Sequence, residues 1–225
     1  LSIRAKLMIL AFLPLVAFLV LAGQESHSRY VAWRNMDTMV QGMNVMVGLG
    51  NLAHELQKER GLSAGYAASK GQKFGTELKA QRVLSDGEAR KLEEVLSAAP
   101  QALADPSFGK SVADMRASLA GLSSARPGID SLGGDARGVI ATYNTLVGKV
   151  LDGCSAVLTM AAGSGLSRQA SAYVELLRGK EIAGQERATL NGAFAAGKFT
   201  PELQRDWLLR VGAQDACFAA FTGIG

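Results

Sequence analysis

The sequence predicts an all-α protein folded as up-and-down antiparallel helical bundles. Aromatic residues make up only 6% of the 225 residues and there are 5 prolines, a composition that disfavours sandwiches and barrels of short strands. The long segments are rich in Ala, Leu, Glu, Lys and Arg, which favour helices. Amphipathic segments joined by short Gly or Pro breaks are typical of antiparallel bundles, so we expect a long first helix that continues from the N-terminal segment.

Composition and charge exclude several classes of function. With 48% hydrophobic residues the chain is too apolar to be disordered, and its formal net charge of +4 comes without a dense basic block, so no nucleic-acid partner is expected. The few histidines and cysteines exclude a Cys/His metal cluster, and no cofactor is expected. Cys154 and Cys217 lie on apolar helical stripes, which predicts two buried free thiols rather than a disulfide.

The N-terminal segment predicts a membrane anchor. Two cations within residues 1–6 precede the uncharged run 7–23, whose 17 residues are at the short end for crossing a hydrocarbon core of about 30 Å. The cations predict that residues 1–6 stay in the cytoplasm and that residues 24–225 form one exported helical domain. Since Ala22 and Gly23 are small residues behind a short apolar run, a cleaved signal peptide stays open as the alternative.

The first exported helices follow from apolar spacing and from breaks. Residues 30–70 contain no proline and repeat apolar residues at helical spacing, and Gly71 can end this helix. Residues 74–99 predict the next helix, or two helices if Ser85 and Glu88, which have capping-box spacing, begin a second one.

The later part of the chain predicts three further helices and the start of a fourth. The helices span 108–124, about 135–161 and 167–197, and the last one begins at 200. A loop at 100–106 precedes the first of them, and Pro127 and Gly128 interrupt it. A break at 133–134 and the segment 163–165 separate the next two helices from what precedes them. Thr200 followed by Pro201 has the residue types of an N-cap and a first helical turn.

Three cations occupy positions where the helical phase predicts core residues. Arg60 continues the apolar stripe that reaches Leu56. Lys180 and Arg187 lie on the stripe that runs from Tyr173 to Phe194. A buried cation without a partner is costly, so each of these positions requires an explanation.

Arg60 and Arg187 also lie in similar local sequences. Each follows a glutamate and precedes a glycine by five residues, Gly65 and Gly192 respectively. These glycines are expected to permit close helix approach or to leave space near the guanidinium. A guanidinium presents a planar fork of donors that suits flat oxyanions, and two such forks on facing helices would enclose a small planar anion. Glu59 and Glu186 lie about 100° away around their helices and are expected on solvated faces.

Two simpler explanations of the arginines stay open. In the first, Arg60 pairs with an internal acid such as Glu175 or Glu181 instead of a ligand. Long cationic side chains can also reach solvent from an apolar stripe and then need no ligand, which would suit a purely structural stalk module.

Two segments resemble a known family. HELQKERGLSAGY (residues 54–66) and KEIAGQERATLNGAFAAGKFTPE (residues 180–202) are similar to the nitrate- and nitrite-sensing NIT domain, especially to copies in the sensors of bacterial methyl-accepting chemotaxis receptors. The resemblance covers roughly Leu49 to the end. It implies a helical sensor of paired four-helix bundles that binds nitrate or nitrite through the arginines matching Arg60 and Arg187.

The resemblance extends to weaker site candidates and to the whole protein. Lys180, in the Lys-Glu pair before the second block, and Ser63, on the stripe of Arg60, are further candidate ligand-binding residues. A homodimer in the bacterial inner membrane is implied, with the sensor in the periplasm, and Met36 to Met46 are expected to form the dimer seam or simply to fill the core. No signalling module follows, so we expect a truncated or a stand-alone sensor.

Rival functions rest on weaker signals. His54 superficially resembles the phosphorylated histidine of a sensor kinase, but the Thr-Pro usual after it is absent and no nucleotide-binding motif follows, so we expect a plain helical polar residue. The sensor region of a membrane histidine kinase, or of another signalling protein with a different ligand, stays open. Glu59 and Glu186 have no nucleophile or metal cluster beside them, so an enzyme is not expected.

Overall fold

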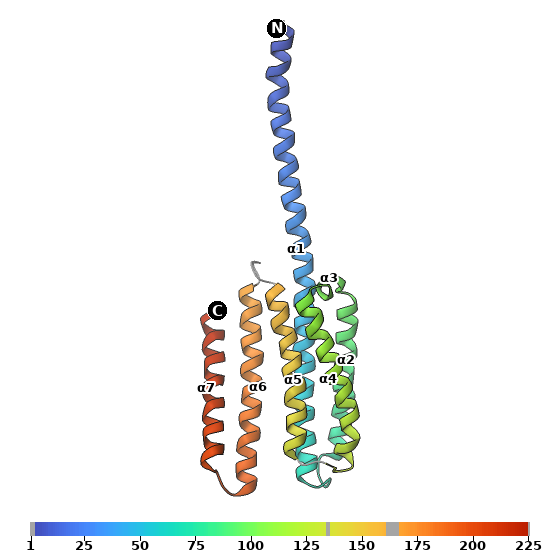
Figure 1. Ribbon diagram of the computed structural model, residues 1–225, viewed down its shortest axis with the longest axis vertical. Coiled ribbons are helices and arrows are strands. Elements are labelled where there is room, and N and C mark those ends of the chain that lie inside the picture. Colours follow the sequence, from blue (N-terminus) through green and yellow to red (C-terminus); the bar gives the residue numbers. More distant parts are fainter. Residues whose placement is uncertain (1–2, 134–135, 161–166, 225) are drawn as a thin grey trace. The chain divides into compact units, whose positions relative to one another are not determined.

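The computed structural model describes residues 3–133, 136–160 and 167–224, and these residues are helical apart from short connections (Figure 1). The helices are, in order, α1 (Ile3–Ala68), α2 (Gly75–Ser97), α3 (Pro100–Leu103), α4 (Pro106–Asp130), α5 (Ala136–Met160), α6 (Ser167–Ala196) and α7 (Pro201–Ile224). The predicted all-α class is confirmed.

The chain divides into two compact units, Leu1–Val40 and Gln41–Gly225. The first unit is the N-terminal part of α1. Among the described residues, no helix combines the length and the apolar character needed to cross a membrane. The side chains of residues 7–11 and 13 lie outside the described part of the structure, so the anchor at 7–23 stays a prediction.

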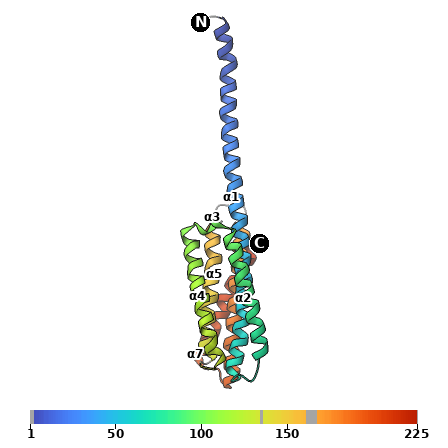
Figure 2. The same cartoon turned by 90° about the vertical axis from the view of Figure 1, so that its right-hand side faces the viewer.

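The core of the second unit is built mainly by α1, α2, α4 and α5, which run alongside one another (Figures 1 and 2). The predicted stripe of Leu49, Leu52 and Leu56 on α1 is almost completely buried, at 0–1% exposed. α1 and α2 can approach closely at Gly48, because a Cβ atom at this position would lie only 3.1 Å from the side chain of Leu92 of α2. Each buried leucine stabilises the fold by about 2 kcal/mol.

Predicted helix ends are confirmed at several positions. After α1, the N–H of Gly71 donates to the carbonyl of Tyr66 at 2.9 Å, and Gly71 has a φ of 78°, which glycine adopts without strain. At the start of α7, the N–H of Leu203 donates to Thr200 Oγ1 at 3.3 Å, as expected of an N-cap. The predicted break at 163–165 lies outside the described residues.

Two predicted boundaries were wrong, and one open alternative is decided. α2 is the single helix that residues 74–99 predict, because Ser85 is buried and donates to the carbonyl of Gln81 within the helix instead of capping a second helix. α4 continues past Pro127, which stands one turn from the end and interrupts the ladder only there. The expected loop at 100–106 contains the short helix α3, which Pro100 begins.

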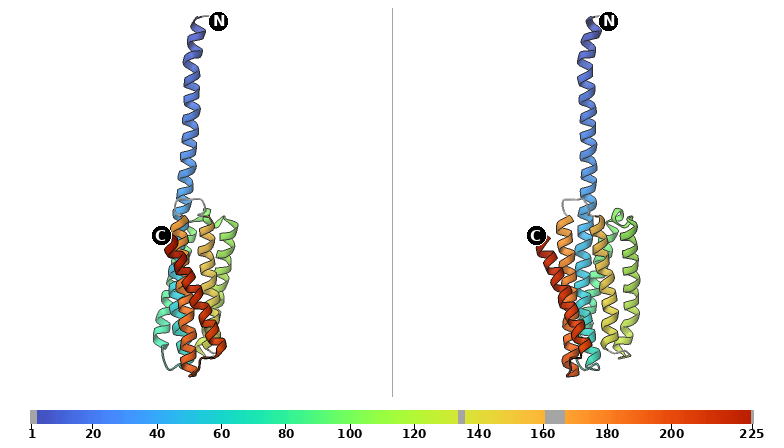
Figure 3. Two further views of the ribbon diagram at one scale, coloured as in Figure 1. Left: turned by 90° about the vertical axis from the view of Figure 1, so that its left-hand side faces the viewer. Right: turned by 60° about the vertical axis from the view of Figure 1, so that its left-hand side comes forward.

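α6 and α7 form a hairpin in which α7 packs along α6 (Figure 3). Gly179 of α6 allows this approach, since the ring of Phe218 lies 2.8 Å from the position of its Cβ atom. No residue of α7 is buried. Cys154 and Cys217 are both free, as predicted, with Cys154 buried and Cys217 half-buried; burial raises the pKa of the Cys154 thiol to about 12.

The predicted dimer seam is only partly described. Met46 is 0% exposed in the core and Met43 packs against it, as ordinary core filling predicts. The side chains of Met36 and Met39 lie outside the described residues, so the dimer seam stays a prediction.

Candidate functional site

Arg60 is buried, with 5% of its surface exposed, so its predicted core phase is confirmed. Its Nη1 atom donates hydrogen bonds of 2.5 Å to Glu181 Oε1 of α6 and to Asn144 Oδ1 of α5. Arg60 on α1 therefore joins three helices. Its partner is one of the two internal acids that the sequence offered as the alternative to a ligand.

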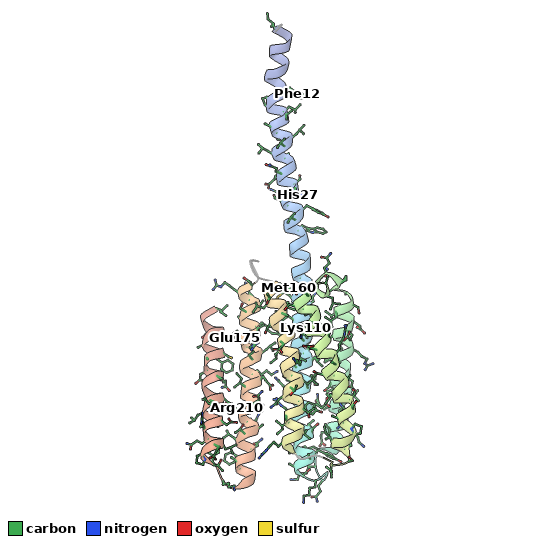
Figure 4. All side chains as sticks on the ribbon, viewed as in Figure 1. Phe12, His27, Lys110, Met160, Glu175 and Arg210 are labelled. Carbon is green, nitrogen blue, oxygen red and sulfur yellow. The ribbon has the colours of Figure 1, made fainter. Side chains whose placement is uncertain are left out.

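The carboxylate of Glu181 accepts hydrogen bonds on both oxygens. Besides the guanidinium of Arg60, Gln57 Nε2 donates to Oε2 at 2.9 Å and Gln185 Nε2 donates to Oε1 at 2.8 Å. Arg210 of α7, labelled in Figure 4, donates to the side-chain oxygen of Gln185. Because Glu181 is 5% exposed, a planar oxyanion is held here by three side chains in a largely dry place.

Gly184 brings the backbone of α6 close to the same guanidinium. A Cβ atom on Gly184 would lie 2.8 Å from Arg60 Nη2. Within the described residues, both hydrogen bonds of Arg60 come from Nη1. The glycine near the guanidinium is therefore Gly184 and not the predicted Gly65, which instead accommodates the ring of Phe74.

Glu59, the neighbour of Arg60, is the centre of a second buried cluster. It is 0% exposed and accepts two hydrogen bonds from Arg126 of α4, at 2.8 and 2.9 Å. The predicted solvated position of Glu59 was wrong, because helices cover α1 on more than one side. Residues 59 and 60 point about 100° apart, so each reaches a different group of helices.

Tyr143 of α5 completes the second cluster. Its hydroxyl donates to Glu59 Oε1 at 2.7 Å, and Ser63 Oγ lies 3.1 Å away. Burial, and then the negative charge of Glu59, raise the pKa of Tyr143, which keeps the hydroxyl protonated as a donor. Ser63 thus lies with Tyr143 and Glu59, and no hydrogen bond joins it to Arg60 in the described structure.

Lys180 and Arg187 are exposed, so their predicted core phase was wrong. α6 carries two apolar stripes, and the one that is buried holds Ala170, Val174, Leu177 and Glu181. Within the described part of the chain, Arg187 has no hydrogen bond or ion pair. Arg60 and Arg187 are therefore not enclosed in one dry pocket in this structure.

Lys180 pairs with His54 across α6 and α1, with 2.8 Å between Lys180 Nζ and His54 Nδ1. Burial, and then the charges of Lys180 and Lys58, lower the pKa of His54 below its usual 6.5, while Glu55 opposes them. Burial also lowers the pKa of Lys180. His54 is therefore neutral near pH 7 and can accept from the ammonium.

We expect this pair to make stability depend weakly on pH. The folded chain takes up the His54 proton less readily than the unfolded chain, so the free energy of unfolding should fall as the pH drops from 6.5 through the lowered pKa. The loss should stay below about 1 kcal/mol because both side chains are largely exposed. Urea unfolding between pH 5 and 8 measures it, and His54→Gln should remove this contribution; an unchanged slope would contradict the assignment.

Sequence reasoning missed the amides and hydroxyls that complete both clusters. Gln57 and Gln185 precede the two Glu-Arg pairs, and this repeated glutamine was the signal that could have found them. Asn144 and Tyr143 are consecutive on α5 and reach different clusters. Among the described residues, no group of three His, Cys, Asp or Glu side chains is placed to hold a metal ion.

Fold and site together define an all-helical bundle protein whose first and late helices meet in a buried arginine–carboxylate cluster. Residues 51–225 match the family model NIT, described as nitrate and nitrite sensing. The chain belongs to this nitrate- and nitrite-sensing family, as the sequence resemblance predicted.

The chain is also similar to two known proteins, one in sequence and one in fold. It is 26% identical over 173 residues to the nitrate regulatory protein of Klebsiella oxytoca, a match over 77% of this chain and 43% of the relative. A solved structure of the NasR transcription antiterminator is similar in fold, with a TM-score of 0.83 and 22% identity over 91% of this chain and 56% of that one. The chain therefore spans about half the length of these relatives.

Proposed function

We propose that this chain is the sensor part of a signalling protein and binds nitrate or nitrite at the Arg60 cluster. The observation that carries the proposal is that this cluster already holds a planar oxyanion, the carboxylate of Glu181, with donors from Arg60, Gln57 and Gln185. Nitrate and nitrite are planar oxyanions of similar size, so the same donors suit them. The family to which the chain belongs supports this choice of ligand.

A second cation is part of the proposal. Arg60 and Glu181 already balance each other, so a bound anion adds a negative charge to a buried place. Arg187 lies three residues after Gly184, one turn along α6 from the point where this helix meets Arg60. We propose that Arg187 supplies the compensating charge when ligand binds, with Lys180 and Ser63 as weaker candidates.

Isothermal titration of the 225-residue chain tests the proposal directly. Nitrate or nitrite should bind saturably at one site, whereas chloride, which is spherical, and acetate, which carries a methyl group, should bind more weakly. Arg187→Ala should weaken nitrate binding without unfolding the chain, since Arg187 is exposed. Equal binding of nitrate and chloride, or no binding of either nitrate or nitrite, would overturn the proposal.

Gly184→Ala should lower nitrate affinity by about tenfold or more. The new methyl group would lie 2.8 Å from Arg60 Nη2, and a buried guanidinium held by two hydrogen bonds must then shift. Gly121→Ala on α4 is the matched control, because nothing lies within 4 Å of that position. Titration of both variants measures the effect, and equal affinities would show that the space beside Arg60 is unimportant.

We propose a membrane chemotaxis or signalling receptor as the whole protein, with the anchor at residues 7–23 and the sensor in the periplasm as a homodimer. The printed names of the relatives favour a second candidate, the sensor part of a nitrate-responsive regulator of transcription antitermination. Fractionation of bacterial cells that produce the 225-residue chain discriminates the two. Recovery in the membrane fraction supports the receptor, and recovery in the soluble fraction supports the regulator.

A further inference from the structure

We infer that Glu181 is a built-in competitor of the anion: its carboxylate holds the donors of Arg60 when no ligand is bound and is displaced when the ligand enters. The inference rests on the proposed function and names the group that sets the affinity of the site. Glu181 would then determine how much nitrate is needed for a response.

The geometry makes Glu181 an internal analogue of the ligand. Its carboxylate and the guanidinium of Arg60 form an ion pair of 2.5 Å, with side chains 7% and 6% exposed. The two amides of Gln57 and Gln185 donate to the same carboxylate from α1 and α6. A planar anion that uses these donors must take them from Glu181.

Charge leads to the same conclusion. Two anions beside one buried guanidinium repel each other strongly where water does not screen them. The side-chain oxygen of Asn144 also accepts a hydrogen bond from Nη1 of Arg60. Asn144 therefore competes for this donor and offers an anion no donor of its own through this contact. The carboxylate of Glu181 therefore opposes an incoming anion even where it does not touch it.

Displacement of Glu181 would couple the ligand to the α6–α7 hairpin. Glu181 connects α6 to α1 through Arg60 and Gln57, and α7 is connected to the same cluster through Arg210 and Gln185. When the carboxylate leaves Arg60, the polar contacts that hold α6 against α1 change. The ligand thus has different affinities for two arrangements of α6, as a signal requires.

The experiment compares nitrate titrations of the 225-residue chain with those of three variants. Glu181→Gln keeps the size of the side chain and removes its charge, so nitrate should bind about tenfold or more tightly. Glu181→Asp keeps the charge but shortens the side chain, so its nitrate affinity should lie between those of the parent and of Glu181→Gln. Glu175→Gln is the matched control, since Glu175, which is labelled in Figure 4, lies on the same helix. Its side chain lies beside Cys217 of α7, and the nitrate affinity of this variant should equal that of the parent.

The outcomes separate this inference from the proposed function. A parent chain that binds nitrate, with Glu181→Gln and Glu181→Asp binding equally or more weakly, overturns the competitor role and leaves the nitrate site standing. Tighter binding by Glu175→Gln as well would assign the effect to net charge and overturn it too. If neither the parent chain nor any variant binds nitrate, both this inference and the proposed function are overturned. If Glu181→Gln does not fold, tighter binding by Glu181→Asp alone supports the inference, and unchanged binding overturns it.

Discussion

Arg60→Met is expected to abolish nitrate binding and to lower the free energy of unfolding by about 3–5 kcal/mol. The variant removes the proposed anion donor, and it leaves the carboxylate of Glu181 buried without its cation. Methionine fills much of the volume of the arginine stem, so the loss reflects the charge rather than a cavity. Denaturant unfolding and nitrate titration of the variant measure the two effects.

A double variant separates stability from binding. With Arg60→Met and Glu181→Leu together, neither charge of this buried pair is left, so the free energy of unfolding should return to within about 1 kcal/mol of the parent. Nitrate binding should remain absent because the guanidinium is missing. A single Arg60→Met variant that binds nitrate as the parent does would remove Arg60 from the site. A double variant as unstable as the single one would show that the unpaired carboxylate is not the cause of the instability.

Much of the fold was predictable because helix ends are local. Thr200 followed by Pro201 begins a helix, and Gly71 ends one, through backbone groups within a few residues. Ser85 left the choice between one helix and two open, and Pro127 was misleading, because the effect of these residues is not local. A serine with capping-box spacing can equally donate inside a helix, and a proline near a helix end interrupts only the last turn. What decides between these outcomes is packing against other helices.

The candidate site was predictable only where one face of a helix is buried. Arg60 follows a single continuous stripe on α1, and its burial followed from the spacing. Glu59 was missed because α1 has partners on more than one side, which the spacing of one stripe does not reveal. On α6, two stripes competed, and the one that carries Glu181 is buried instead of the one that carries Arg187. The partners Asn144 and Tyr143 come from α5 and required the tertiary structure.

Glu59→Gln is expected to lower the free energy of unfolding by about 3 kcal/mol or more. Glu59 is 0% exposed and accepts two of the three hydrogen bonds of Arg126 as well as that of Tyr143. The change therefore leaves a partly buried guanidinium facing an uncharged amide, with Asp86, which is more exposed, as its remaining carboxylate partner. One oxygen of the carboxylate becomes an amide donor and opposes the donors of Arg126. Denaturant unfolding, followed by the helical circular dichroism signal, measures the loss.

The chain offers a matched control for this prediction in Glu93, which also accepts two hydrogen bonds from one arginine, Arg116. That pair likewise joins α4 to a neighbouring helix, but its side chains are 48% and 42% exposed. Water screens the charges and can solvate the arginine left behind, so Glu93→Gln should cost no more than about 1 kcal/mol. The same chemical change thus tests burial alone. Similar losses in the two variants would mean that the Glu59 cluster is accessible to water, and that the helices around α1 are packed less closely than the structure shows.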